Sequence, residues 1–588
     1  MKKILELISE EVMKAFKDAG YDEAAGKVNV SNRPDLCEYQ CNGAMALAKQ
    51  LKCAPIQIAT AVVEKLSGSS TFSKAEAVMP GFINLNVSGE FLSDYVAKMS
   101  ESDKFGLEAP DKPLKIVIDY GGPNVAKALH VGHLRSAIIG ESVKRICLYM
   151  GHDTIGDIHM GDWGLPMGLV MTELKERQPD LPYFDESYTG EYPSEAPFTV
   201  SELEEIYPTA SGKSKQDEAY KAAAMEATFK LQNGVRGYRA LWNKIIEVSV
   251  TDLKKNYDNL NVHFDLWNGE SSVHDLIPGM VQKMKDDGFA YLSEGALVVD
   301  VKEETDTKEV PPCMLLKSDG AAKYDTTDLA TILDRMDKYN PDKIIYLTDK
   351  RQELYFTQIF RCARKTGLVK PETELVHIGF GTMNGKDGKP FKTRDGGVMR
   401  LEFLVRDVFE EMLKKIKENK DIGEAEAEST AKIVGLSALK YGDLSNQPSK
   451  DYIFDMDKFT SFEGNTGPYV LYTIVRIKSI LDKFAAQGGN ISSCRIAAPV
   501  NESEKNLMKA LSFFSQTVES AFNELAPNRI CAFIYDLSNA LNSFYHETKI
   551  LTETDATKKA GFIALIDLTK RVLETSIDLL GFSAPERM

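Results

Sequence analysis

One stretch near residue 120 constrains the fold of this chain more than any other. Residues 114–120, LKIVIDY, are a continuous apolar run of the kind that forms a buried parallel strand. After a Gly-Gly-Pro turn, a helix is expected from about Gly132, and residues 151–159 are then expected to form a second strand. The apolar face of this helix would carry Leu134, Ile138, Ile146 and Tyr149. The pattern predicts a strand–helix–strand unit, and therefore an α/β domain.

Further strand signals extend this unit into a larger sheet. The apolar runs alternate with helical stretches and occupy residues 296–301, 313–317, 343–348 and 375–380. This alternation predicts a doubly wound, Rossmann-like nucleotide-binding domain over residues 106–402. Residues 173–236 are charged and contain several prolines and glycines, so they are expected to be an insertion rather than core.

The segment before this domain has a different character. Residues 1–105 predict a small α+β domain, because an amphipathic helix opens the chain and a strand-like run follows. The apolar residues of the opening helix are Ile4, Leu5, Ile8, Val12 and Phe16. Residues 78–87 are expected to form the strand, with Phe82 and Asn84 on the same side.

Helical patterns dominate from Phe403 to the C-terminus. We expect a connecting helical region at residues 403–460 and an all-α helix-bundle domain at residues 461–588. Two apolar stripes at helical spacing support the bundle. The first consists of Ile530, Ile534, Leu537, Leu541 and Phe544, and the second of Phe562, Leu565, Val572, Leu573, Ile577 and Leu580.

Charge, apolar runs and cysteine spacing argue against several classes of protein. The net charge of −16 argues against a generic nucleic-acid coat, although it is compatible with a local basic groove. The sequence contains no apolar run of about 18 residues, the length that would span a membrane. Of the 8 cysteines, only Cys37 and Cys41 lie close together, and no second pair or histidine completes a zinc site. We therefore expect a cytoplasmic protein with free thiols and without zinc.

The segment between the first strand and the first helix carries the most informative motif. Residues 123–133 read Pro-Asn-Val-Ala-Lys-Ala-Leu-His-Val-Gly-His. In a doubly wound fold, this position presents helix amides to phosphate. Gly132 would let the backbone approach a nucleotide, while His130 and His133 would donate hydrogen bonds to phosphate oxygens. The alternatives are a pair of structural histidines or a metal site.

A second segment, residues 385–397, is glycine-rich and strongly basic in an otherwise acidic chain. A loop of this composition can close on a triphosphate, with Lys389 and Lys392 neutralising charge in the transition state. The alternative is a solvated surface loop. The histidine motif favours the first interpretation, because both segments would then serve one phosphate site.

Together the two segments resemble the HIGH and KMSKS signatures of class I aminoacyl-tRNA synthetases, with residues 389–393, Lys-Pro-Phe-Lys-Thr, in the second place. Further segments narrow the resemblance to the arginyl enzymes and follow that family's order along nearly the whole chain. They are residues 119–127, 159–164, 324–330, 462–469, 542–546 and 585–588. The insertion is the part that the resemblance covers least, and Leu165-Pro-Met stands where the family commonly has Thr-Gln-Phe.

The resemblance implies an arginine–tRNA ligase that is a monomer. Such an enzyme activates L-arginine with ATP and Mg²⁺ to arginyl-adenylate, and releases pyrophosphate. It then transfers arginine to the 3′-terminal adenosine of tRNA(Arg) and releases AMP. The resemblance also implies that adenylate formation requires bound tRNA. Rival interpretations are another class I synthetase, a nucleotidyltransferase, which is typically shorter, and a tRNA-binding paralogue that has lost catalysis.

The resemblance further assigns residues to each substrate. The ATP and catalytic residues would be Lys127, His130, Gly132, His133, Lys389, Lys392 and Thr393. Whether Lys127 or Lys392 carries the phosphate charge stays open. The arginine pocket would consist of Asp119, Asn124, Tyr324, Asp328 and Gln352, with carboxylate acceptors for the guanidinium. The N-terminal and anticodon-binding domains would contact tRNA through Phe82, Asn84, Tyr469, Tyr472, Tyr545 and Met588.

Overall fold

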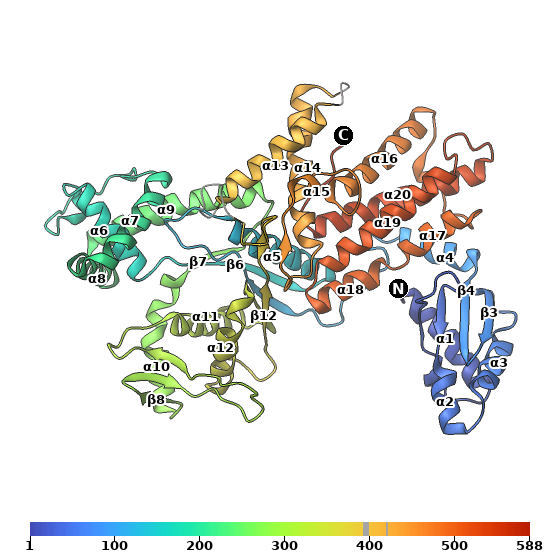
Figure 1. The fold of residues 1–588 in the computed structure, drawn as a ribbon, viewed down its shortest axis with the longest axis horizontal. Helices are drawn as coiled ribbons and strands as arrows, with labels where there is room; N and C mark the ends of the chain where they lie inside the picture. The colour runs from blue at the N-terminus through green and yellow to red at the C-terminus, as the bar shows by residue number, and fades with distance from the viewer. Residues whose placement is uncertain (392–398, 419–421) are drawn as a thin grey trace. The chain divides into compact units, whose positions relative to one another are not determined.

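The computed structural model describes residues 1–391, 399–418 and 422–588 (Figure 1). These residues form two compact units. Unit 1 comprises residues 1–109, 461–578 and 583–588, and unit 2 comprises residues 110–460 and 579–582. Lys392 and Thr393, two of the residues predicted for the phosphate site, lie outside the described residues.

Unit 2 is built on a parallel sheet, as the sequence predicts. Its strands are β5 (Lys115–Asp119), β6 (Asp153–Met160), β7 (Leu266–Gly269), β11 (Lys343–Asp349) and β12 (Glu374–Phe380). They lie in the order β12-β11-β5-β6-β7, and neighbouring strands are parallel. From β5, the chain first adds β6 and β7 on one side and then β11 and β12 on the other side. The direction of winding therefore reverses between β5 and β11. This arrangement confirms the doubly wound, Rossmann-like class.

Helices connect or precede the strands β5, β6, β11 and β12. Helix α5 (Val131–Met150) joins β5 to β6 and packs against β5, β6 and β11. Helix α11 (Tyr324–Tyr339) precedes β11, and α12 (Glu353–Lys365) joins β11 to β12. The predicted apolar face of α5 is confirmed for Leu134, Ile138 and Ile146, which are buried.

The sequence-based assignment of the middle strands to the parallel sheet is wrong. Strands β8 (Ala290–Ser293), β9 (Ala296–Val299) and β10 (Cys313–Leu316) form a separate antiparallel sheet in the order β10-β9-β8. Glu294 and Gly295 both have positive φ and close the β8–β9 hairpin. Apolar runs look alike in both kinds of sheet, so periodicity could not separate them. The true edge strand, β7, has only four residues and was missed.

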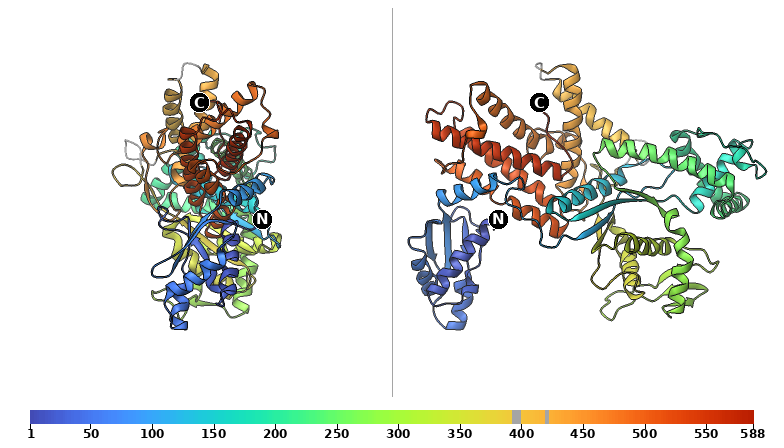
Figure 2. Two further views of the ribbon diagram at one scale, coloured as in Figure 1. Left: turned by 90° about the vertical axis from the view of Figure 1, so that its right-hand side faces the viewer. Right: turned by 180° about the vertical axis from the view of Figure 1, so that it is seen from behind.

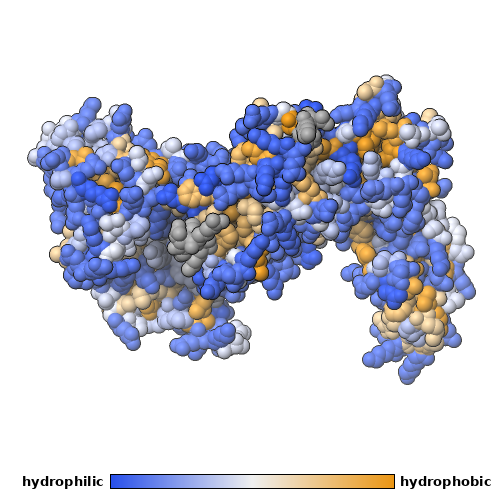
Figure 3. Space-filling view, turned by 45° about the horizontal axis from the view of Figure 1, so that its top comes forward, coloured by the Kyte–Doolittle hydropathy of each residue, from blue (hydrophilic) through white to orange (hydrophobic). Residues whose placement is uncertain are grey.

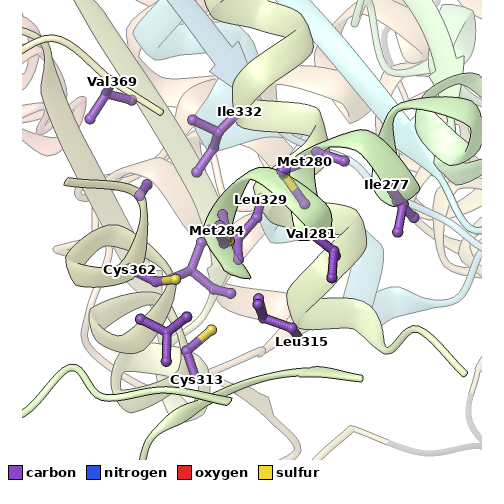
Figure 4. Close-up of a cluster of buried hydrophobic side chains, with 14 of the residues drawn as sticks. Ile277, Met280, Val281, Met284, Cys313, Leu315, Leu329, Ile332, Cys362 and Val369 are labelled. Atoms are coloured by element: carbon purple, nitrogen blue, oxygen red, sulfur yellow. The ribbon is translucent and has the colours of Figure 1, made fainter. Parts of the chain in front are cut away.

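One hydrophobic core ties the small sheet to the parallel sheet. Helices α10 (Ile277–Asp286), α11 and α12 contribute Met280, Leu329 and Cys362, and β10 contributes Leu315 (Figure 4). The same core includes Val117 of β5 and Ile344 of β11, which are fully buried. Because α11 is packed from both sides, the residues at its N-terminus are held in a fixed place relative to the sheet.

The predicted insertion folds as helices. Helix α6 (Leu165–Arg177) leads through the short helix η2 (Pro182–Phe184) to α7 (Val200–Gln216), α8 (Glu218–Gln232) and α9 (Arg236–Asn259). These helices contact one another and gather on one side of unit 2 (Figure 1). They have a small core of their own, made by Leu169, Ala210, Tyr220 and Ala224.

The rest of unit 2 is largely helical, as expected for residues 403–460. Helices α13 (Leu401–Ile416) and α14 (Glu424–Leu444) pack against each other and are followed by the short α15 (Met456–Phe459). The strands β13 (Met383–Asn384) and β14 (Tyr452–Ile453) form a parallel pair.

Unit 1 contains a four-stranded antiparallel sheet in the order β1-β2-β4-β3. The strands are β1 (Val28–Val30), β2 (Tyr39–Cys41), β3 (Phe72–Val78) and β4 (Phe82–Val87). Helices α1 (Ile4–Asp18) and α3 (Pro55–Leu66) pack against it and each other (Figure 2), while α2 (Gly43–Leu51) and α4 (Gly89–Ser100) complete the α+β part. The run at residues 78–87 is therefore not one strand, because residues 79–81 form the turn of a hairpin.

The C-terminal part of unit 1 is the expected helix bundle. Its helices are α16 (Gly467–Ala486), α17 (Glu502–Leu511), α18 (Phe514–Glu524), α19 (Asn528–Glu547) and α20 (Ala556–Leu579). Both predicted stripes are buried in α19 and in the segment that begins with α20. Stripe periodicity was thus sufficient to predict this part of the fold.

Hydrophilic residues cover most of the face shown in Figure 3, and hydrophobic residues gather in separate patches. No helix within the described ranges has the length and apolar character needed to cross a membrane. All 8 cysteines are free thiols, and Cys37 and Cys41 are buried.

Candidate active site

The candidate active site lies at the carboxyl edge of the parallel sheet, where open α/β sheets bind their ligands. The loops that follow β5 and β6 are joined there. Val125 donates a backbone hydrogen bond to Gly161, and Gly161 donates one to Pro123. A Cβ atom at Gly161 would lie 2.1 Å from the side-chain oxygen of Asn124, so a larger residue there would have to displace the Asn124 side chain.

His130 and His133 begin helix α5, and their ring centroids are 3.9 Å apart. Nδ1 of His130 accepts a hydrogen bond from the backbone N–H of Gly132 at 3.0 Å. Nδ1 of His133 accepts one from the backbone N–H of His130 at 3.1 Å. A neutral imidazole that accepts at Nδ1 carries its proton on Nε2. Both rings can therefore donate from Nε2 to a ligand oxygen near the N-terminus of α5.

Both histidines are neutral at pH 7. Burial lowers the pKa of His133 to about 3, with a smaller contribution from His130. Burial, and then the positive charge of Lys127, lowers the pKa of His130. Lys127 thus lies close enough for its charge to act on both rings. The phosphate side of the site offers one ammonium and two neutral hydrogen-bond donors.

The glycine-rich basic segment begins as a tight turn. Gly385 donates a backbone hydrogen bond to the carbonyl of Lys389 at 2.8 Å, and Lys389 is exposed on this turn. Lys392 and Thr393 belong to the undescribed stretch. Of the predicted phosphate-binding lysines, the structure therefore brings Lys127 to the histidines.

Asp328 and Tyr324 share the first turns of α11, as the sequence predicts. The carboxylate of Asp328 accepts a hydrogen bond from the hydroxyl of Tyr355 at 2.5 Å. Burial raises the pKa of Asp328 to about 6, although this hydrogen bond opposes the change. Tyr324 is the first residue of the helix and is 68% exposed. A poorly solvated carboxylate beside an accessible tyrosine is suited to a guanidinium.

The charge of Asp328 also acts on a second carboxyl group, that of Glu270. Glu270 directly follows β7. Burial, and then the negative charges of Asp328 and Asp162, raise the pKa of Glu270 to about 8. The carboxylate of Asp162 accepts hydrogen bonds from the backbone N–H and hydroxyl of Ser271, and burial raises its pKa as well. These three carboxyl groups lie in a poorly solvated space that resists their ionisation, and a bound cation would stabilise their ionised forms.

Asp119 ends β5 but is bound by an internal arginine. Arg335 donates to Asp119 at 2.6 Å and to Asp157 at 2.7 Å. Both Arg335 and Asp157 are 2% exposed. Because this guanidinium binds an oxygen of Asp119, Asp119 is less available to a ligand than Asp328 and Glu270.

The remaining predicted arginine-binding residues lie exposed at the same edge of unit 2. Asn124 belongs to the loop after β5, and Gln352 ends the short helix η4 (Lys350–Gln352) that follows β11. Both strands end at the carboxyl edge of the sheet, so these amides are accessible beside the carboxylates. All five predicted arginine-binding residues thus belong to segments at this edge.

The predicted anticodon-binding tyrosines gather in unit 1. The Arg476 guanidinium lies 4.9 Å from the ring centroid of Tyr472 and 5.0 Å from that of Tyr545. Arg476 also bonds the side chain of Asn542, and Asn542 donates to the Tyr469 hydroxyl at 2.9 Å. Tyr472 and Tyr545 are 42% and 39% exposed, so their rings remain accessible. Helices α16 and α19 thus present aromatic faces around one arginine.

The other predicted tRNA contacts have separate locations in unit 1. Phe82 and Asn84 lie on β4. Phe82 is half-buried, whereas Asn84 is buried and accepts a hydrogen bond from Gln40 at 2.8 Å. Met588 is half-buried at the C-terminus.

Sequence reasoning missed four residues of these sites. Glu270, Asp162 and Tyr355 join the predicted arginine pocket around Asp328, and Arg476 joins the tyrosine cluster. Asp162 lies within the recognised segment 159–164, so that motif was a usable signal. Glu270 and Tyr355 stand in segments without a motif, and only chain folding brings them near Asp328. Within the described residues, no group of three or more His, Cys, Asp or Glu could hold a metal ion.

Comparison with protein families covers almost the whole chain. Residues 2–87 match the arginyl tRNA synthetase N terminal domain, and residues 96–456 match the catalytic domain of tRNA synthetases class I (R). Residues 470–588 match the DALR anticodon binding domain. These three segments follow one another in the order that the sequence predicts.

Curated relatives and solved structures agree with these matches. Proteins named arginine–tRNA ligase from Agathobacter rectalis and Alkaliphilus oremlandii are 65% and 55% identical, and each match covers 100% of both chains. The fold is similar to arginyl-tRNA synthetase structures from Plasmodium falciparum (TM-score 0.82, 23% identity) and Thermus thermophilus (TM-score 0.77, 22% identity), each covered at 100% of both chains. The chain therefore belongs to the arginyl-tRNA synthetase family of class I aminoacyl-tRNA synthetases.

Proposed function

We propose that this chain is an arginine–tRNA ligase that activates L-arginine with ATP and transfers it to tRNA(Arg). The observation that carries the proposal is the pair of poorly solvated carboxyl groups, Asp328 and Glu270, at the sheet edge that also holds His130 and His133. A guanidinium presents planar donors and a fixed positive charge, so it would satisfy both carboxylates at once. Family membership supports the same substrate.

The arginine pocket would work by charge and shape. Asp328 would accept hydrogen bonds from the guanidinium, Glu270 would add a second negative charge, and Tyr324 would cover the ligand. Asn124 and Gln352 would bind polar groups of the substrate near the sheet edge. Asp119 would act through Arg335, which holds it in place.

In the first reaction, a carboxylate oxygen of arginine attacks the α-phosphorus of ATP. The new P–O bond forms as the bond to the terminal diphosphate breaks, so pyrophosphate leaves with the electron pair. His130 and His133 would donate hydrogen bonds from Nε2 to the phosphate oxygens, and Lys127 would supply a positive charge. Lys389, Lys392, Thr393 and the backbone at Gly132 would complete the phosphate site.

In the second reaction, the 2′-hydroxyl of the terminal adenosine attacks the carbonyl carbon of the adenylate. The hydroxyl loses its proton, the ester bond to arginine forms, and AMP leaves. No covalent bond to the protein is needed, so the side chains bind and orient the reactants. Mg²⁺ keeps several waters and binds substrate phosphates, so we propose that it enters with ATP and neutralises phosphate charge.

For tRNA, we propose that the anticodon bases stack on the exposed faces of Tyr472 and Tyr545, whose rings both lie next to the Arg476 guanidinium. Tyr469 and Met588 would border this surface, and Phe82 and Asn84 of β4 would contact another part of the tRNA. Stacking on an aromatic side chain contributes roughly 1–3 kcal/mol per base. Tyr472→Ala is therefore expected to weaken tRNA binding by about 5- to 100-fold, measured by filter binding. Unchanged binding would remove Tyr472 from the interface.

Arginine binding is expected to strengthen as pH rises from about 6 to about 8. Glu270 has its pKa raised to about 8 and Asp328 to about 6, so both carboxyls are partly protonated in this window. The cation binds the ionised forms and so displaces protons, which gives up to about a tenfold gain in affinity per pH unit for each proton. Calorimetry in two buffers of different ionisation enthalpy would count the protons released. Glu270→Gln should flatten the pH dependence above about pH 6, and an equally steep curve would contradict the assignment.

The whole function is tested by ATP–pyrophosphate exchange with each of the twenty amino acids, with and without total tRNA. We expect exchange with arginine alone, and only when tRNA and Mg²⁺ are present. Exchange with another amino acid would indicate a different class I synthetase. Absence of exchange with retained tRNA binding would indicate a catalytically silent paralogue.

We further propose a division of labour along the chain. Residues 1–105 would contact tRNA, residues 106–402 would perform catalysis, residues 403–460 would connect, and residues 461–588 would bind the anticodon. The chain would act as a monomer in the cytoplasm, where tRNA charging supplies protein synthesis. Sedimentation of the purified chain tests the monomer, and fractionation of cells tests the location.

A further inference from the structure

The helical insertion reaches the phosphate side of the active site through one helix. The ammonium of Lys127 lies 4.1 Å from the ring centroid of Tyr207, which belongs to α7. Across residues 1–391, 399–418 and 422–588, no carboxylate forms an ion pair with Lys127. The aromatic ring is thus the partner that the structure provides for this ammonium.

A second contact anchors the same turn of α7. Glu204, one helical turn before Tyr207, forms an ion pair with Arg400. Arg400 pairs with His130 through an isolated antiparallel bridge, and Val131 donates a backbone hydrogen bond to Met399 at 3.0 Å. One turn of α7 therefore contacts both segments that flank the phosphate side, namely the loop before α5 and the segment before α13.

We propose that Tyr207 is a positioning residue that holds the ammonium of Lys127 in place for the ATP phosphates. The inference rests on the proposed role of Lys127 in the ligase reaction. A carboxylate partner would cancel the charge of Lys127, whereas an aromatic face attracts the ammonium and leaves its full charge for the phosphates. The ring also limits the rotamers of a long flexible side chain, and so reduces the entropy lost when ATP binds.

Tyr207 lies near residues of both the phosphate end and the arginine end of the proposed active site. The pKa of Tyr324 is raised by burial, then by the charge of Glu270 and then by Tyr207. Tyr207 therefore lies near the tyrosine of the proposed arginine pocket. Tyr207 is half-buried and packs against the small core of the insertion. Through Tyr207, the insertion therefore contacts Lys127 and lies near Tyr324.

The test compares Tyr207→Leu, Tyr207→Phe and Lys127→Met in tRNA-dependent ATP–pyrophosphate exchange with the full chain. Tyr207→Leu should lower kcat roughly tenfold, in line with loss of a desolvated cation–π contact, and leave the KM for arginine within about twofold. Tyr207→Phe keeps the ring and should stay within about twofold of the unchanged chain. Phe229→Leu removes a 65% exposed aromatic ring from α8 of the same insertion and serves as the matched control.

The double variant separates positioning from a structural effect. If Tyr207 acts through Lys127, adding Tyr207→Leu to Lys127→Met should lower kcat no further. Losses that multiply, or a Tyr207→Phe chain as slow as Tyr207→Leu, would overturn the inference. If Lys127→Met lowers kcat and Tyr207→Leu does not, the inference about Tyr207 is overturned while the proposed role of Lys127 stands. Full activity of Lys127→Met would overturn the proposed role of Lys127 and the inference together.

Discussion

Asp328→Asn is expected to raise the KM for arginine by on the order of 10²- to 10³-fold, while the KM for ATP stays nearly constant. The substitution keeps the size of the side chain but removes the negative charge that would face the guanidinium of bound arginine. It also leaves the hydroxyl of Tyr355 without its carboxylate acceptor. Exchange kinetics with varied arginine and varied ATP would measure both constants.

The stability of the Asp328→Asn chain distinguishes recognition from a structural role. Burial raises the pKa of Asp328 to about 6, so its ionised form costs folding free energy when arginine is absent. Its removal should therefore leave the Tm unchanged or raise it slightly. Asp334→Asn is the matched control on the same helix, because Asp334 pairs with Lys338 at 2.9 Å. A similar KM increase in the control, or a large fall in Tm for Asp328→Asn, would contradict the assignment.

Arg335→Met is expected to destabilise unit 2 by about 3–5 kcal/mol. The Arg335 guanidinium is 2% exposed and bridges Asp119 at 2.6 Å and Asp157 at 2.7 Å. Methionine fills part of the same volume but leaves two carboxylates of the sheet edge without a counter-charge. Thermal and urea unfolding of the full chain would show a lower midpoint.

Two further variants test the cause of this destabilisation. Adding Asp157→Asn to Arg335→Met removes one of the orphaned charges and should recover part of the lost stability. Arg351→Met breaks an ion pair with Asp349 whose arginine is 81% exposed, so it should change the midpoint little. Equal midpoints for Arg335→Met and Arg351→Met would show that the buried bridge does not stabilise the fold.

Local patterns were sufficient for much of the fold and for the local positions of the histidine pair and of Asp328. The apolar run at 114–120 is a parallel strand, and His130 and His133 begin the following helix. Asp328 and Tyr324 are one turn apart on one helix. These features depend on neighbours within a few residues, which periodicity and motif spacing record directly.

Long-range placement was beyond these patterns. Strands β9 and β10 carry apolar runs like those of β5, yet they form an antiparallel sheet, because sheet membership depends on pairing partners far along the chain. The insertion at residues 173–236 looked like a polar surface segment, although Tyr207 within it contacts Lys127. Its polar composition concealed this contact.

The sequence by itself determined the class of fold, the helix bundle, the histidine pair at the start of α5 and the position of Asp328 one turn from Tyr324. Only the tertiary structure decided that Glu270 joins Asp328, that Arg335 occupies Asp119, and that Tyr207 faces Lys127. The physical reason is that a residue's chemistry depends on solvation and on the charges around it. Folding sets both, by bringing together side chains that lie tens to hundreds of positions apart in the chain.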